Sequence, residues 1–186
     1  MDTEPFGLEF PKARAALVYA ERRHQGQLRK CGGPFILHPL EVAELLRDAG
    51  ASDELVAAGL LHDVTEKTAT APADVRRRFG ARVAKLVDVV SEDPAIASYR
   101  ARKAALREQV AVACEDALKL FAADKLSKVN ELLRYEVEAP ARRIEHYRRS
   151  VELLQTLLPG YALTDRLAAD FARLESRLPV GSGGGN

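Results

Sequence analysis

Histidine and aspartate residues occur in this chain at positions from which they could bind a metal ion together. His62 and Asp63 are adjacent and directly follow the apolar stretch Gly59-Leu60-Leu61. Two strongly polar side chains that close an apolar helix carry a desolvation cost unless they find partners, and one shared metal ion would satisfy both. The alternative is a helix end that emerges into solvent, where neither side chain needs a partner.

Asp124 is a second polar residue inside an apolar stretch. Its neighbours include Leu120, Phe121 and Leu126. A buried carboxylate requires a nearby cation, which is either a metal ion or the charged group of a Lys or Arg side chain. The sequence leaves both alternatives open for Asp124.

Glu66 follows His62 by four residues and Asp63 by three. On a continuing helix this spacing places its carboxylate on the same face, where it could orient or deprotonate an attacking water. Arg29 and Lys30 lie in a glycine-containing turn and could bind phosphate or stack on a base. A solvated surface remains the alternative for Glu66 and for the basic pair.

The elements that position these residues are expected to be helices, so the fold class is all-α. Ala, Leu, Arg and Glu are abundant and β-branched runs are rare. The segment 53–64 is apolar almost all round, which predicts a buried central helix. We expect helices over 11–25, 38–49, 53–64, 72–80, 81–91, 99–114, 115–133, 140–158 and 163–177, with Gly and Pro residues at most of the breaks.

Composition indicates one globular domain in which basic and acidic residues nearly balance. The chain has 186 residues, with 28 basic and 27 acidic side chains and a net charge of +1. No overall basic field would attract nucleic acid or a membrane, and neither a signal peptide nor a membrane-spanning run is present. Cys31 and Cys114 are interpreted as reduced thiols of a cytoplasmic protein. We expect a domain over 1–180 and a flexible Gly/Ser tail over 181–186.

Several short blocks follow one another in an order and spacing that match a known family. They are Gln27-Leu28-Arg29-Lys30, Gly33-Pro34-Phe35-Ile36-Leu37-His38-Pro39, Leu60-Leu61-His62-Asp63-Val64-Thr65-Glu66, Phe79-Gly80 and Ala123-Asp124-Lys125-Leu126. In these blocks the chain resembles the HD-superfamily metal-dependent phosphohydrolases, specifically the hydrolase domain of RelA/SpoT proteins and the small alarmone hydrolases of the metazoan SpoT-homologue class. The resemblance covers residues 6–178 and implies a single HD-domain bundle of about eight to ten helices.

The resemblance implies a metal site formed by four side chains. One divalent ion, usually Mn²⁺, would be held by His38, His62, Asp63 and Asp124. Two imidazoles and two carboxylates suit Mn or Fe and do not exclude Zn. His24 does not match a ligand position of the family, so we expect it outside this site.

The resemblance also implies a nucleotide substrate. The expected reaction removes the 3′-pyrophosphate of (p)ppGpp and gives GDP or GTP and pyrophosphate. The length leaves no room for a following synthetase segment, so alarmone synthesis is not expected. The residues implied in substrate binding are Arg29 and Lys30 beside the purine, Arg143 and Tyr147 at phosphate or ribose and, with a looser match, Arg102 and Lys103 at phosphate.

Two lysines depart from the family pattern beside the expected site. The family motif His-Asp-x-x-Glu-Asp ends here in Lys67, which leaves Glu66 to position the water alone. Lys67 could neutralise a phosphate or a leaving group, or pair with Asp63 at i,i+4 spacing. Lys128 replaces an Asn that in the family helps to hold the nucleotide.

All four implied metal ligands are present, whereas Lys67 and Lys128 differ from the residues that the family has beside the substrate. This pattern favours a changed substrate over a lost activity. The main hypothesis is the one that the resemblance implies, metal-dependent hydrolysis of (p)ppGpp with Glu66 and Lys67 as catalytic residues. One alternative is an HD hydrolase of another phosphorylated nucleotide, such as a phosphorylated nicotinamide cofactor. The second is a catalytically weak module that binds a nucleotide for regulation. A purely structural helical domain would bind no metal.

Overall fold

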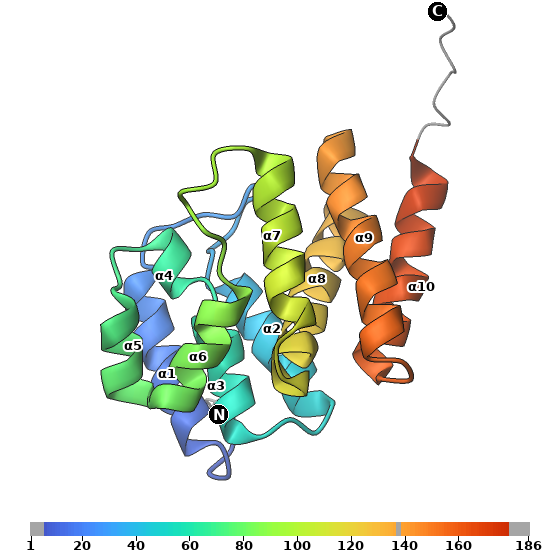
Figure 1. Cartoon of the computed structure of the whole chain (residues 1–186). Helices are drawn as coiled ribbons and strands as arrows, with labels where there is room; N and C mark the ends of the chain where they lie inside the picture. Colours follow the sequence, from blue (N-terminus) through green and yellow to red (C-terminus); the bar gives the residue numbers. More distant parts are fainter. Residues whose placement is uncertain (1–5, 137–138, 179–186) are drawn as a thin grey trace, which may run out of the picture.

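The computed structural model describes residues 6–136 and 139–178, and within these residues it is a bundle of α-helices (Figure 1). The all-α prediction is confirmed. The tail expected at 181–186 lies outside the described residues. The helices are α1 (Pro11–Arg23), α2 (Leu37–Asp48), α3 (Asp53–Leu61), α4 (Val64–Lys67), α5 (Pro72–Phe79), α6 (Ala81–Val90), α7 (Tyr99–Ala111), α8 (Glu115–Tyr135), α9 (Ala141–Leu157) and α10 (Ala162–Arg177).

Helix α3 lies at the centre of the first half of the fold, as its apolar sequence predicts. Every residue from Leu55 to Leu61 is buried, and the helix packs against α1, α2 and α6. Its start is fixed by Ser52, whose hydroxyl accepts a hydrogen bond from the Leu55 N–H at 3.4 Å. No helix within the described ranges is long and apolar enough to cross a membrane.

The end of α3 differs from the expected continuous helix over 53–64. Helix α3 ends at Leu61, and His62 and Asp63 form a turn before the short helix α4. Glu66 therefore belongs to a separate helical segment, and the prediction that it continues the face of His62 is wrong. The turn keeps both polar side chains inside the bundle, at 4% and 5% exposure, so the solvent-exposed alternative is wrong as well.

A close approach between α2 and α3 brings two histidines into the same region. Gly59 lies so near to α2 that a Cβ atom there would meet Ala43 Cα at 3.2 Å and Leu46 Cδ1 at 3.0 Å. The absence of a side chain at this position permits the contact. His38 in the first turn of α2 and His62 at the end of α3 consequently lie close together.

Two further elements complete the surroundings of these histidines. Helix α8 packs against α2, α3, α6, α9 and α10 and carries Asp124 at a buried position near its middle. The loop between α1 and α2 turns back on itself at Gly32 and Gly33, whose φ angles of 88° and 79° suit glycine. The Arg29 N–H donates to the Gly33 carbonyl at 2.9 Å and closes this turn.

Candidate metal centre and substrate cavity

His38, His62 and Asp124 converge from three different helices or helix ends. One ligand atom from each lies within 4.8 Å of the others, and all three residues are buried. The Asp124 Oδ1 atom is 3.1 Å from His38 Nε2 and 3.4 Å from His62 Nε2. Asp63 approaches from the turn, with Oδ2 at 3.7 Å from His38 Nε2 and 3.4 Å from His62 Nε2. The structure thus brings together the four residues that the sequence singled out.

The hydrogen bonds around the two imidazoles fix which ring nitrogen faces the centre. His62 Nδ1 lies 2.8 Å from the Gly59 carbonyl, which can only accept, so Nδ1 carries the proton. The Ser127 hydroxyl donates to Glu41 Oε2 at 2.9 Å and therefore accepts from His38 Nδ1, also at 2.9 Å. Both Nε2 atoms are left to face the carboxylates. A metal-binding histidine commonly has its second nitrogen anchored in this way.

The environment of His62 tests whether a metal ion fits. Its Nε2 atom is buried and has no hydrogen-bond partner in the described part of the chain. Burial lowers the pKa of His62, but the charges of Asp63 and Asp124 outweigh burial and raise this pKa to about 10. A buried group that attracts a proton so strongly lies where a cation is favoured. The orphaned nitrogen and the two carboxylates fit a divalent ion with mixed N and O ligands.

Asp124 also has two lysine partners on its own helix. Lys125 Nζ lies 2.6 Å from Oδ2, and Lys128 Nζ lies 2.7 Å from Oδ1, the same oxygen that faces both histidines. Burial lowers the pKa of Lys125 to about 8, against the opposing charge of Asp124. For Lys128 the charges of Asp124 and Asp63 outweigh burial and raise the pKa. Asp124 therefore has lysine partners and also belongs to a group of side chains that could hold a metal ion.

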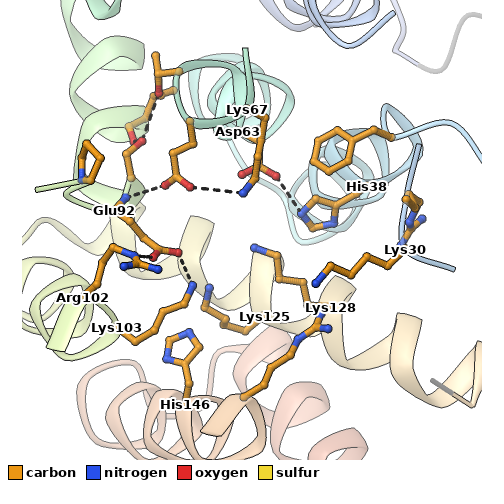
Figure 2. A pocket seen from close by; sticks show the side chains of 18 of the residues that line it. Lys30, His38, Asp63, Lys67, Glu92, Arg102, Lys103, Lys125, Lys128 and His146 are labelled. Atoms are coloured by element: carbon orange, nitrogen blue, oxygen red, sulfur yellow. Dashed lines mark hydrogen bonds and ion pairs between the residues drawn. The ribbon is translucent and has the colours of Figure 1, made fainter. Parts of the chain in front are cut away.

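A cavity of about 1420 Å³ opens beside this centre and is lined by all of the expected substrate residues (Figure 2). His38 and Asp63 line it, while His62 and Asp124 lie behind them. Figure 2 shows Lys125 and Lys128 between the His38 side of the cavity and the side formed by Arg102 and Lys103. The lining residues predicted from sequence are Arg29, Lys30, Glu66, Lys67, Arg102, Lys103, Lys128, Arg143 and Tyr147.

Glu66 and Lys67 face the cavity next to Asp63. The Glu66 carboxylate accepts a hydrogen bond from the Glu92 backbone N–H at 2.6 Å through Oε1. Its other oxygen lies 3.9 Å from Lys67 Nζ. Lys67 Nζ thus pairs with Glu66 and not with the Asp63 carboxylate, so the suggested pairing with Asp63 is wrong, although the Lys67 backbone N–H donates to the Asp63 carbonyl at 2.9 Å. Gln27 holds the Lys67 carbonyl through a hydrogen bond of 2.8 Å.

Glu92 is a residue of this cavity that sequence reasoning missed. Its carboxylate pairs with Arg102 at 2.6 Å and with Lys103, while its backbone N–H binds Glu66. It therefore connects the loop after α6 with α7. Burial raises the pKa of Glu92, but the two cationic partners outweigh burial and lower it. No motif marks Glu92, because the residues that it joins lie in different elements.

Arg143 and Tyr147 point the same way from α9, as their spacing predicts. The Arg143 Nε–H donates to the Tyr147 hydroxyl oxygen at 2.8 Å, which leaves the tyrosine O–H free to donate to another group. His146 lies nearby, below Lys103 and Lys125 in Figure 2, and accepts a hydrogen bond from Arg107. Burial and the charges of these lysines hold the pKa of His146 far below its ordinary value, so it is neutral.

The loop residues Arg29 and Cys31 form the opposite wall of the cavity with Glu131 of α8. Arg29 Nε donates to Glu131 Oε1 at 3.1 Å, and the Cys31 thiol donates to the same oxygen at 2.8 Å. Cys31 is a free thiol, as is Cys114. His24 is buried and bound to Gln27 at 2.9 Å, and it is not part of the metal-binding group.

The residues that support the metal centre were not expected from the sequence. Ser127 and Glu41 orient His38, and the Gly59 carbonyl orients His62. The one available signal is that Ser127 follows Asp124 by three residues and so shares its helix face.

Comparison with known families and curated proteins gives consistent matches. The family model described as HD domain matches residues 16–149. A guanosine-3′,5′-bis(diphosphate) 3′-pyrophosphohydrolase of Aquifex aeolicus is 37% identical over 126 residues, which are 66% of this chain and 18% of that protein. A GTP pyrophosphokinase of Streptomyces coelicolor is 35% identical over 147 residues, 77% of this chain and 17% of that protein. The chain spans less than a fifth of the length of either relative.

Solved structures also resemble this fold. A metazoan orthologue of SpoT, described as hydrolysing ppGpp, superposes with a TM-score of 0.77 and 26% identity, over 88% of this chain and 96% of that one. A Listeria monocytogenes protein superposes with a TM-score of 0.70 and 30% identity, over 78% of this chain and 98% of that one.

Proposed function

Because the chain belongs to the HD domain family, we propose that it is a metal-dependent phosphohydrolase that removes the 3′-pyrophosphate of (p)ppGpp. The products are GDP or GTP and pyrophosphate. The named activities of the Aquifex relative and of the metazoan SpoT orthologue support this substrate. As part of the proposal, the protein acts in the cytoplasm on a small nucleotide, and nucleic acid and membranes are not its partners.

The observation that carries the proposal is the pair of Nε2 atoms that face two carboxylates. The hydrogen bonds of Nδ1 to Ser127 and to the Gly59 carbonyl orient both rings, so that a metal ion would take the place of any proton on Nε2. We propose His38, His62, Asp63 and Asp124 as ligands of one divalent ion, Mn²⁺ in the first instance, with Fe or Zn as alternatives. The chemistry that such an ion supplies when bound is Lewis-acid activation of the phosphoryl group and of the attacking water.

Side chains around the centre are proposed to accept a proton, offset negative charge and donate a hydrogen bond to the substrate. Glu66 is held by the Glu92 N–H through one oxygen, so the other is available to orient a water and accept its proton. Lys67 lies beside Glu66 and offsets negative charge on the leaving group. Because the Tyr147 hydroxyl accepts from Arg143, its own proton can be donated to a phosphate or ribose oxygen.

Basic residues on the cavity wall are proposed to bind the phosphates. Lys128 and Arg143 line the cavity beside the metal centre, with Lys103 and Arg102 farther along. Arg29 and Lys30 lie at the opposite end, where a purine can stack on the planar guanidinium. The site therefore offers positive charge for a substrate with several phosphates, which the net charge of the whole chain does not reveal.

A second candidate is a module that binds a nucleotide and hydrolyses it slowly. The feature that favours it is the contact between Glu66 and Lys67, because the ammonium group 3.9 Å from Oε2 attracts the same oxygen that would have to orient the water. Hydrolysis of another phosphorylated nucleotide, such as a phosphorylated nicotinamide cofactor, belongs to the same chemistry as the main proposal.

Product analysis tests these proposals. The Mn²⁺-loaded protein is incubated with ppGpp, pppGpp and NADPH, beside Asp63→Ala and the control Asp170→Ala on α10, which does not line the cavity. We expect GDP and pyrophosphate from ppGpp with the wild type and the control, and none with Asp63→Ala. If only NADPH loses phosphate, the substrate is a phosphorylated nicotinamide cofactor and not (p)ppGpp. Stoichiometric binding of ppGpp without product would establish the binding module.

A further inference from the structure

The two ends of the cavity differ in their chemistry. Beyond Lys125 the wall carries Arg102 and Lys103, which are paired with Glu92 and can also bind phosphate groups. The other end, where Lys30 lies in Figure 2, is formed by the loop between α1 and α2 and by the last turns of α8. That end includes the apolar side chains Leu28 and Leu132, the guanidinium of Arg29, the thiol of Cys31 and the carboxylate of Glu131.

The carboxylate of Glu131 lies at this end of the cavity. Its side chain is 15% exposed and lies against Arg29, whose side chain is 5% exposed. Both hydrogen bonds from Arg29 and Cys31 reach Oε1, and Oε2 has no hydrogen-bond partner among the described residues. Burial raises the pKa of Glu131, but these two donors outweigh burial and lower it, so the group is ionised at neutral pH. An ionised carboxylate repels phosphate and accepts from N–H donors.

We propose that Glu131 recognises the Watson–Crick edge of a guanine base and makes this cavity selective for guanine over adenine nucleotides. The inference rests on the proposed function, in which the cavity holds a purine nucleotide. Guanine presents two adjacent donors on this edge, N1–H and the N2 amino group, which can both converge on Oε2, the oxygen that Arg29 and Cys31 leave free. Adenine presents the N6 amino group beside the unprotonated N1, whose lone pair would face the carboxylate. Arg29 and Cys31 keep the Glu131 side chain oriented for this contact.

Binding of nucleoside diphosphates tests the inference without turnover. The Mn²⁺-loaded protein is titrated calorimetrically with GDP and with ADP. Wild type is expected to bind GDP about 10- to 100-fold more tightly than ADP, the discrimination typical of a paired base contact. Glu131→Gln offers one acceptor and one donor, so the preference should fall to near unity or reverse. Glu131→Asp, which withdraws the carboxylate by one carbon, should weaken the preference without reversing it.

The matched control is Glu115→Gln, which removes an exposed carboxylate from the first turn of the same helix and should keep the preference for GDP. Circular dichroism confirms that each variant is folded. Equal affinity of wild type for GDP and ADP, or an unchanged preference in Glu131→Gln, would overturn the inference.

Hydrolysis separates this inference from the proposed function. The guanosine and adenosine 3′,5′-bis(diphosphates) are compared as substrates of wild type and Glu131→Gln. If the wild type hydrolyses both nucleotides equally, the proposed phosphohydrolase activity is supported and the proposed selectivity for guanine is refuted. If neither is consumed while GDP still binds more tightly than ADP, the hydrolase fails and the role of Glu131 stands.

Discussion

Replacing Lys128 with Met is expected to tighten the binding of a divalent ion. The Lys128 ammonium lies 2.7 Å from Asp124 Oδ1, and the same oxygen lies 3.1 Å and 3.4 Å from the Nε2 atoms of His38 and His62. A cation held by these three groups must share or displace the contact with Lys128. Lys128 therefore weakens metal binding by about the free energy of one hydrogen bond between charged groups.

The magnitude follows from the burial of this pair. The side chains of Lys128 and Asp124 are 27% and 6% exposed, so solvent screens their contact only partly. A hydrogen bond between charged groups contributes about 1.5–3 kcal/mol, which corresponds to about 10- to 100-fold in affinity. Methionine keeps most of the length of the side chain and removes the charge. We therefore expect Lys128→Met to lower the dissociation constant for Mn²⁺ by this factor.

Competition with a chromogenic chelator measures that constant directly. Lys119→Met is the matched control, since Lys119 lies on the same helix and pairs with Glu115 at 2.7 Å, away from the centre. The control should bind Mn²⁺ as the wild type does. An unchanged or weaker affinity in Lys128→Met would show that Lys128 does not compete at this centre. The activity of the variant should fall nevertheless, because a phosphate-binding charge is lost.

Three further outcomes are expected. Gly59→Ala should destabilise the fold by about 1–3 kcal/mol in urea unfolding, because its Cβ would meet the Ala43 backbone at 3.2 Å; a stability equal to the wild type would contradict the close approach of α2 and α3. Mn²⁺ at a concentration of about 100 times its dissociation constant should raise the free energy of unfolding by about 2.7 kcal/mol, and Asp124→Asn should abolish this gain; thermal unfolding with and without chelator decides it. Because Glu92 has a lowered pKa in the folded state, its contribution to stability is complete above the unfolded value of 4.5 and is lost as the pH falls through the folded value. Glu92→Gln should thus be less stable than wild type at pH 7 and lose less stability between about pH 5 and pH 3, and parallel acid-unfolding curves would refute this.

The sequence by itself determined the helical class and most helix boundaries within a few residues. Helical periodicity is local, so the apolar stretch before His62 predicts a buried helix without knowledge of its neighbours. The break at His62 and Asp63 was not foreseen, because both residues tolerate helical dihedral angles. In the tertiary structure both side chains stay inside the bundle, where Asp63 lies beside His38 of α2 and His62 beside Asp124 of α8.

The candidate ligands were also identified from the sequence, through the order of the matching blocks. Their convergence was not, because His38 and Asp124 are 86 residues apart and periodicity does not encode the distance between them. The tertiary structure alone decided which nitrogens face the centre, through the Ser127 hydroxyl and the Gly59 carbonyl. These contacts depend on the approach of whole helices.

The partners of Lys67 and Lys128 were likewise decided only by the tertiary structure. From the sequence, Lys67 and Lys128 were departures at the edge of the site with several possible partners. The structure pairs Lys67 with Glu66 and places Lys128 on the Asp124 oxygen that faces both histidines. Glu131 left no signal in the sequence, since its meaning depends on a loop about 100 residues earlier in the chain. Residue types and local spacing determine which chemical groups the chain offers. The packing of distant helices determines which charged groups are buried together, and buried charges interact more strongly because water screens them less.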